Sequence, residues 1–258
     1  MIETEKLEVG KDFVEHNFKG NRILLVGITG SHYYGFPAPD SDLDLKGIHA
    51  VPTRELFGLE KLPPGKNLEK YWKGSLCDFT SNEVEQAVKL LLKGNGNMLE
   101  RIFSPFQLFN TDELLQLQSL KAEYISSRFY HHYKGFFHKK CTEYNNRGNC
   151  PIKPLLYIYR VALTGIHLLL TGEVIGDVNI TGPEYGFREV AELVQIYSVT
   201  SEKECLDVKI AESFFSKWPL LQEKLDQALE KTCLPEIPRG KDVCSEWLIE
   251  LRLRGLIG

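Results

Sequence analysis

Two aspartates, Asp42 and Asp44, stand two positions apart where an apolar run predicts a strand over residues 43–51. Aspartate is disfavoured inside strands, so the pair requires an explanation. Because strand side chains alternate, both carboxylates project from one face and lie close enough to share a cation. A divalent metal removes their mutual repulsion, and Mg²⁺ prefers a few carboxylates with water and phosphate oxygens. The alternative is an Asx-capped turn at Asp40–Asp42, with Asp44 facing solvent.

A glycine and a serine, Gly30 and Ser31, follow a second apolar run, RILLVGI at residues 22–28. This run is rich in branched side chains, which is typical of a strand that is covered on both faces. The glycine backbone can approach a phosphate closely, and the serine hydroxyl and adjacent N–H groups can donate to its oxygens. The two elements therefore predict a site for a metal-bound nucleoside triphosphate.

The pairing of Gly30-Ser31 with Asp42-Leu43-Asp44 resembles the motif of the DNA polymerase β-type nucleotidyltransferase superfamily. The longer stretches GSHYYGF, SDLDLKGI and CDFTSNEVEQAVKLLLKGNGNMLERIFSP resemble the predicted-nucleotidyltransferase branch named for its association with RNA repair. The resemblance covers most of residues 22–109 and, more loosely, the helices of residues 151–173. It implies the α+β fold class: a small mixed β-sheet nucleotidyltransferase domain with flanking helices, followed by a helical domain.

The resemblance also implies a reaction and its residues. A hydroxyl attacks the α-phosphate of the triphosphate, pyrophosphate leaves, and two Mg²⁺ ions, for which Mn²⁺ can substitute, hold the reacting oxygens. The family has a third carboxylate on a following strand, and Asp78 matches that position; the alternative is an ordinary residue just before a helix cap. Asp42 and Asp44 would hold both metals, and Asp78 would ligate one and help to deprotonate the acceptor. Gly30 and Ser31 would hold the β and γ phosphates.

The acceptor is left open by the residues themselves. The resemblance favours an RNA end, while a protein hydroxyl or a small molecule remains an alternative, and ATP is the first nucleotide to consider. The formal net charge of −4, from 31 basic and 35 acidic residues, excludes bulk attraction of a polyanion, so RNA would require a local patch. Two competing classes are a non-catalytic, antitoxin-like nucleotide-binding module and a helical scaffold with an incidental D-x-D.

A polar stripe marks the otherwise apolar helix predicted after Pro151. Its members recur at spacings of three and four residues and so share one face; they are Lys153, Tyr157, Arg160, Thr164 and His167. The two cations have no acids beside them in the stripe and loosely match a lysine–arginine pair of the RNA-repair branch. Lys153 and Arg160 are therefore predicted phosphate contacts, with a solvated helix face as the alternative.

The most basic and aromatic stretch of the chain covers residues 130–147. Such a mixture can stack on and neutralise a single-stranded RNA end. The favoured interpretation is nevertheless an amphipathic helix whose aromatic side chains are core and whose cations are solvated.

The organisation changes near residue 110, where short strands and turns give way to helical periodicity. This change predicts a catalytic domain over residues 1–110 and a helical domain over residues 111–258. A helix over residues 82–93 is expected, with a capping box formed by Thr80 and Glu83 and with Gly94 at its C′ position.

Six scattered cysteines lack zinc-site spacing and a disulfide framework, which favours reduced thiols and a cytoplasmic protein. The N-terminal residues lack the apolar region of a secretory signal. The most apolar stretch, residues 155–175, contains Arg160 and His167 and is interpreted as a buried helix. No transmembrane segment or membrane partner is expected, and nothing in the sequence indicates an oligomeric state.

Overall fold

The computed structural model describes residues 2–59, 63–147 and 149–257, and the chain divides into two compact units. The sheet unit comprises Met1–Gly30, Asp42–Ile125 and Pro238–Gly258. The helical unit comprises Ser31–Ser41 and Ser126–Ile237. The predicted boundary near residue 110 falls inside the sheet unit, because the helices α5 (Asp112–Ser119) and α6 (Lys121–Tyr124) and the last helix pack with that unit.

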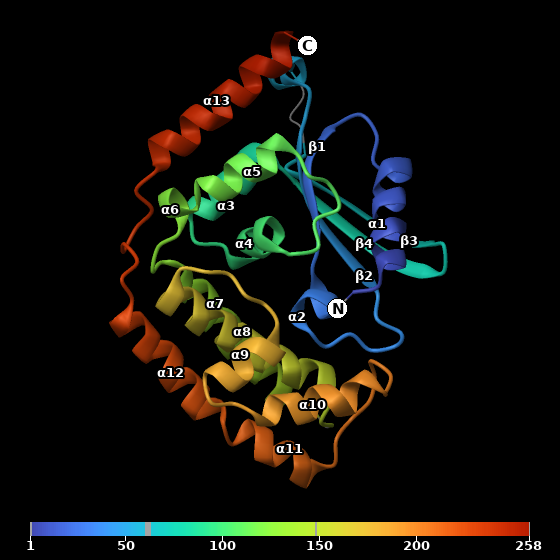
Figure 1. Cartoon of the computed structure of the whole chain (residues 1–258), viewed down its shortest axis with the longest axis vertical. Helices are drawn as coiled ribbons and strands as arrows, with labels where there is room; N and C mark the ends of the chain where they lie inside the picture. Colours follow the sequence, from blue (N-terminus) through green and yellow to red (C-terminus); the bar gives the residue numbers. More distant parts are fainter. Residues whose placement is uncertain (1, 60–62, 148, 258) are drawn as a thin grey trace. The chain divides into compact units, whose positions relative to one another are not determined.

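The sheet unit contains four strands with helices around them (Figure 1). In chain order its elements are α1 (Thr4–Asn17), β1 (Arg22–Ile28), β2 (Leu43–Ala50), the 3₁₀ helix η1 (Thr53–Phe57), β3 (Gly65–Trp72), β4 (Ser75–Glu83), α3 (Val84–Leu92), α4 (Gly96–Phe103), α5 (Asp112–Ser119), α6 (Lys121–Tyr124) and α13 (Lys241–Ile257).

The strands form one mixed sheet in the order β1-β2-β4-β3. β2 is antiparallel to β1 and parallel to β4, whereas β3 is antiparallel to β4. The predicted strands over 22–28 and 43–51 are thus confirmed, and so is the mixed sheet. β4, which carries Asp78 as the resemblance implies, extends from Ser75 to Glu83, and β3 was not expected at all.

One face of the sheet is covered by α1, a helix that the sequence analysis did not predict. Its Val9, Phe13 and Val14 form a buried cluster with Leu45 of β2 and Phe79 of β4. Alternation then places the even-numbered side chains of both strands on the opposite face.

The helix predicted over residues 82–93 is shorter at its start. Pairing with β3 keeps Thr80 and its neighbours in β4, so the predicted capping box is wrong. Glu83 is the N-cap of α3, and its side chain accepts a hydrogen bond from the backbone N–H of Glu85 at 2.8 Å. Gly94, with φ of +80°, confirms the predicted left-handed residue after Lys93.

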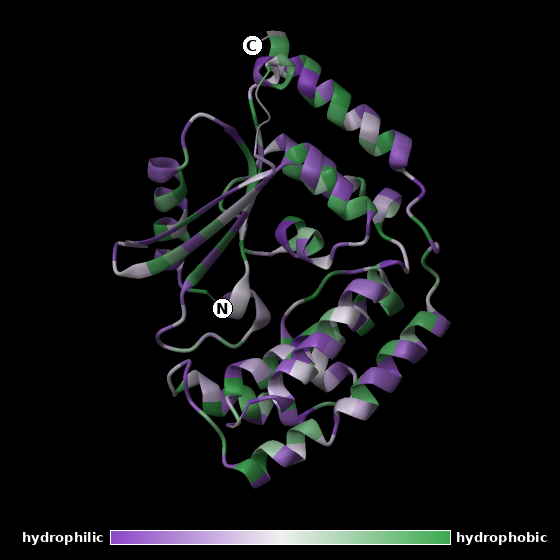
Figure 2. Ribbon diagram, turned by 180° about the vertical axis from the view of Figure 1, so that it is seen from behind, coloured by the Kyte–Doolittle hydropathy of each residue, from purple (hydrophilic) through white to green (hydrophobic). Residues whose placement is uncertain are grey.

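α13 returns to the sheet unit and contacts η1, α3 and α6. Its buried side chains, Cys244, Trp247 and Leu251, are spaced by three and four residues and so form one face. Figure 2 shows green and purple residues alternating along this helix, as expected for a helix with one covered side.

The helical unit consists of α-helices joined by short connections (Figure 1). The first of them, α2 (Gly30–Tyr34), begins at Gly30, the last residue of the sheet unit's first segment. The helices that follow are α7 (Phe129–Asn145), α8 (Ile152–Thr171), α9 (Val178–Glu184), α10 (Glu189–Ser198), α11 (Val208–Phe215) and α12 (Trp218–Lys231).

α8 is the core helix of this unit and contacts α7, α9, α10 and α12. It is long and apolar enough to cross a membrane by length and composition, but 78% of its most apolar window is buried inside the protein. Gly165 allows α7 to approach closely, since a Cβ there would lie 2.7 Å from the Cβ of Tyr133. These contacts confirm the interpretation of this segment as a buried helix.

Candidate nucleotidyl-transfer site

Adjacent parallel strands bring two of the predicted carboxylates side by side. Asp44 of β2 and Asp78 of β4 are partners in the strand register, and neighbouring strands lie about 4.8 Å apart. Asp42 immediately precedes β2 and is two residues from Asp44. All three lie in the sheet unit, and strand alternation places Asp44 and Asp78 on the sheet face opposite α1.

A lysine that the sequence analysis did not single out bridges two of these carboxylates. Lys46 Nζ lies 2.7 Å from Asp78 Oδ2 and 3.3 Å from Asp44 Oδ1. Lys46 lies two residues beyond Asp44 on β2, so the alternation that aligns the aspartates also places its side chain on their face. That spacing was the available signal for it.

Burial raises the pKa of Asp44, and the negative charges of Asp42 and Asp78 raise it further, while Lys46 lowers it. The net shift is upward although the Lys46 ammonium is close. Burial is thus the main cause of the shift. Three carboxylates and one lysine still leave excess negative charge at this face when ionised, so an additional cation would be stabilised there.

The turn at Gly30 packs closely against the side chain of Asp44. Gly30 has φ of +64°, and a Cβ at this position would lie 1.9 Å from Asp44 Oδ2. The preceding Thr29 donates its backbone N–H to the carbonyl oxygen of Asp44 at 2.8 Å. Only glycine leaves room for this carboxylate, so the glycine supports the carboxylate directly in addition to its predicted role in phosphate binding.

The donor set suits the Mg²⁺ that the family resemblance implies, because hard carboxylate oxygens are the ligands that Mg²⁺ prefers. The absence of a side chain at Gly30 leaves the room that the Asp44 carboxylate occupies. Among the described residues, no three His, Cys, Asp or Glu side chains form a ready-made metal cluster. The ammonium of Lys46 lies within 3.3 Å of two of the three candidate ligands, Asp44 and Asp78.

The other predicted phosphate contacts belong to the helical unit. Ser31 is 1% exposed, and its hydroxyl has no hydrogen-bond partner among the described residues, as expected of a donor that awaits a ligand. Lys153 Nζ lies 2.5 Å from Glu202 Oε1, which also accepts a hydrogen bond from Ser41 at 2.9 Å. Lys153 is thus held by an acid from outside its helix, which its stripe on α8 did not indicate.

Arg160 is 4% exposed, and the centre of its guanidinium lies 3.9 Å above the ring of Tyr34. The alternative of a solvated helix face is therefore wrong for this position, and the predicted phosphate contact stays a prediction. His167, farther along the stripe, is also buried, and its Nδ1 lies 2.9 Å from the Tyr185 hydroxyl. The stripe consequently faces other elements of its own unit.

Comparison with known proteins bears on the activity of this site. Residues 5–241 match RlaP, the RNA repair pathway DNA polymerase beta family. Uncharacterized protein MJ0002 of Methanocaldococcus jannaschii is 36% identical over 162 residues, which are 60% of this chain and 64% of that protein. Uncharacterized protein YcgL of Bacillus subtilis is 28% identical over 149 residues, which are 56% of this chain and 55% of that protein. The match thus spans less than two thirds of the length of either relative.

A solved structure is also similar. It is the crystal structure of a nucleotidyltransferase-like protein from Exiguobacterium sibiricum, with 10% sequence identity and a TM-score of 0.34. The similarity covers 87% of this chain and 74% of that one.

Proposed function

The chain belongs to the RNA repair pathway DNA polymerase beta family, which is nucleotidyltransferase-like, and on this premise we propose that it is a Mg²⁺-dependent nucleotidyltransferase. It moves a nucleoside monophosphate from a nucleoside triphosphate to a hydroxyl of an RNA end and releases pyrophosphate. The observation that carries the proposal is the set of three carboxylates, with Asp44 and Asp78 in register on parallel strands and Asp42 two residues away.

In the proposed reaction the acceptor oxygen forms a bond to the α-phosphorus, and the bond from that phosphorus to the α–β bridging oxygen breaks. Asp78 takes the proton of the acceptor hydroxyl. Asp42, Asp44 and Asp78 would hold the metal, either Mg²⁺ or Mn²⁺, which supplies positive charge to the reacting oxygens. Lys46 keeps Asp44 and Asp78 together until that charge arrives.

The chain's remaining proposed contacts hold the triphosphate. The Gly30 turn and the Ser31 hydroxyl bind the β and γ phosphates, which gives a partner to the buried serine oxygen. Lys153 and Arg160 supply positive charge, and a phosphate must compete with Glu202 for Lys153. ATP is the first triphosphate to test. We propose the cytoplasm as the compartment, which the six free cysteines support.

The test is incubation of the purified protein with each α-³²P-labelled nucleoside triphosphate, Mg²⁺ or Mn²⁺, and a pool of small RNAs. Label on RNA is expected, and Asp42→Ala should reduce it at least about a hundredfold, because a metal ligand is lost. Asp112→Ala, which removes an exposed carboxylate of the sheet unit, should leave it unchanged.

Melting curves should show that both variants remain folded. Label on a polypeptide would show that the acceptor is a protein hydroxyl and not an RNA end. Metal-dependent nucleotide binding without any transfer would indicate a regulatory module instead, and a folded Asp42→Ala variant with full activity would contradict the assigned site.

A further inference from the structure

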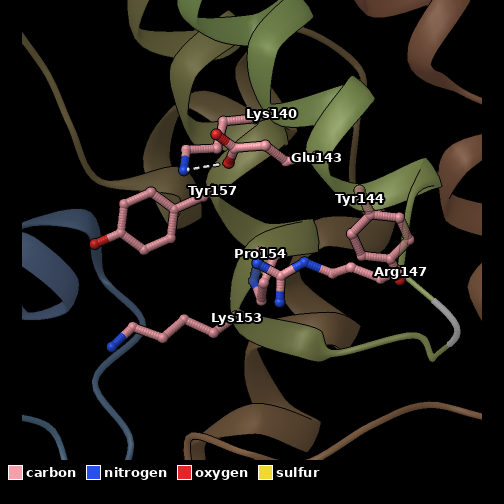
Figure 3. A pocket seen from close by; sticks show the side chains of 7 residues that line it. All are labelled: Lys140, Glu143, Tyr144, Arg147, Lys153, Pro154 and Tyr157. Atoms are coloured by element: carbon pink, nitrogen blue, oxygen red, sulfur yellow. Dashed lines mark hydrogen bonds and ion pairs between the residues drawn. The ribbon is translucent and has the colours of Figure 1, made fainter.

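A cavity of about 190 Å³ lies within the helical unit, between the end of α7 and the start of α8 (Figure 3). Lys140 and Tyr144 come from α7, Arg147 follows it, and Lys153 and Tyr157 come from the first turns of α8. The carboxylates of the sheet unit do not line it.

The walls of this cavity combine aromatic surface with positive charge. Tyr144 and Tyr157 present rings, and Figure 3 shows the Arg147 guanidinium beside Pro154 in the middle of the group. The acidic lining residue, Glu143, accepts a hydrogen bond from Lys140 at 2.8 Å, which lowers its pKa. Three cations against one carboxylate make the lining net positive.

The structure also shows which part of the basic and aromatic stretch of residues 130–147 can reach a ligand. Tyr130, Tyr133 and Phe137 are buried, which confirms that these aromatic side chains are core. Lys134 bonds to Tyr130 and lies 3.1 Å from Asp226. Tyr144 is buried as well, so what the stretch offers at the cavity, where α7 ends, is the positive charge of Lys140 and Arg147.

We propose that this cavity binds one nucleotide of a single-stranded RNA, with its base against Tyr157 and Arg147 and its flanking phosphates at Lys140 and Arg147. Rings with adjacent cations are the means by which proteins hold single strands. A volume of about 190 Å³ is below the roughly 300 Å³ at which sites for drug-sized ligands begin, which suits a single base. The net charge of −4 also requires such a local patch.

This inference rests on the proposed function, because it supplies the binding site for the RNA acceptor. Lys153 is paired with Glu202 at 2.5 Å and is left to the proposed triphosphate. Tyr157 also packs against Tyr34 and Phe36, so its ring is held in place before RNA arrives. A base that stacks there loses little of its binding energy to ordering the protein.

The test is fluorescence anisotropy with a labelled eight-nucleotide single-stranded RNA, without nucleotide or divalent metal. Lys140→Ala and Arg147→Ala should each weaken binding about fivefold, the effect of losing one partly exposed ion pair. Lys139→Ala is the matched control, because Lys139 also faces Glu143, at 3.9 Å, but is 67% exposed and does not line the cavity. It should stay within twofold of the wild type.

Salt dependence and competing nucleic acids complete the test. Two phosphate contacts predict that log K falls with log salt with a slope of about −1.4, at about −0.7 for each contact with a single strand. Each cavity variant should make this slope shallower by about 0.7. A duplex of equal charge should bind more weakly, because its bases are paired.

The assignment is overturned if Lys140→Ala and Arg147→Ala bind as the wild type does, or if Lys139→Ala weakens binding equally. Equal binding of the duplex, or tighter binding of single-stranded DNA, would also overturn it. Asp42→Ala should bind RNA normally, so this inference and the proposed function can fail separately. A protein that transfers no nucleotide can still bind RNA more weakly in its Lys140→Ala and Arg147→Ala variants. Conversely, an active enzyme can show no such weakening.

Discussion

Substitution of Gly30 by alanine tests the link between the turn after β1 and the carboxylates. Two effects can be separated. An alanine at φ of +64° destabilises the fold by about 1–2 kcal/mol, as for any L-residue in the left-handed region. The new Cβ would also lie 1.9 Å from Asp44 Oδ2, whereas Cβ atoms keep at least 3.0 Å from such neighbours.

Asp44 must therefore move by about 1 Å, and a displacement of that size at a reacting centre can reduce the rate about a hundredfold. We expect Gly30→Ala to remain folded, to lose about 1–2 kcal/mol of unfolding free energy, and to lose nucleotide transfer by about two orders of magnitude. Its affinity for Mn²⁺ should fall as well. Urea denaturation, labelled-nucleotide transfer and Mn²⁺ binding measure the three quantities.

Gly20→Ala is the matched control. Gly20 has φ of +82° and lies in the same unit, but no atom that its Cβ would meet lies within 4 Å. It should lose similar stability and keep its full transfer rate. The reasoning is refuted if Gly30→Ala transfers nucleotide at the wild-type rate, or if both variants lose activity in proportion to their stability.

Two further predictions concern the sheet. Lys46→Met should bind Mn²⁺ about fivefold more tightly, because the ammonium that lies 2.7 Å from Asp78 and 3.3 Å from Asp44 no longer competes; unchanged or weaker binding in a paramagnetic-resonance titration would contradict this. Burial lowers the pKa of His49 to about 4, whereas the unfolded chain takes up that proton near pH 6.5. The unfolding free energy should thus fall by about 2 kcal/mol from pH 7.5 to pH 5, and denaturation of His49→Gln should show a smaller fall.

The sequence was sufficient for the parts of the site that depend on local pattern. Apolar runs of branched residues identified β1 and β2, and period-two alternation aligned Asp42 with Asp44. The identification of Asp78 came from the family resemblance. Its register with Asp44 depends on a parallel pairing between strands about 30 residues apart in the chain, which no local pattern determines.

Elements with weak local signals were missed for physical reasons. β3 is a partly exposed strand at the edge of the sheet, so its side chains show little apolar alternation. α1 has many charged residues, and its few apolar side chains are buried only because they pack against one face of the sheet. Tertiary contacts, which the sequence does not display, decided both elements: pairing with β4 for β3, and burial against the sheet for α1.

The division into units shows the same limit at a larger scale. Composition changes near residue 110, but α13 returns to the sheet unit from the far end of the chain. Its Trp247 donates a hydrogen bond to Gln116 at 2.9 Å, and Arg252 pairs with the N-cap Glu83 at 2.6 Å. A linear boundary cannot represent contacts between segments that are separated by more than 100 residues.

Lys46 changes the charge balance among the carboxylates of the candidate site. The alternation that places Asp42 and Asp44 on one face places Lys46 there too, and the register of β2 with β4 brings Asp78 within 2.7 Å of it. A strand that carried only the aspartates would hold adjacent negative charges at a partly buried face, which raises their pKa and opposes folding. The lysine offsets part of that repulsion, while burial keeps the pKa of Asp44 raised. One lysine against three carboxylates leaves room for a further positive charge, which is the balance that the proposed metal-dependent transfer would require.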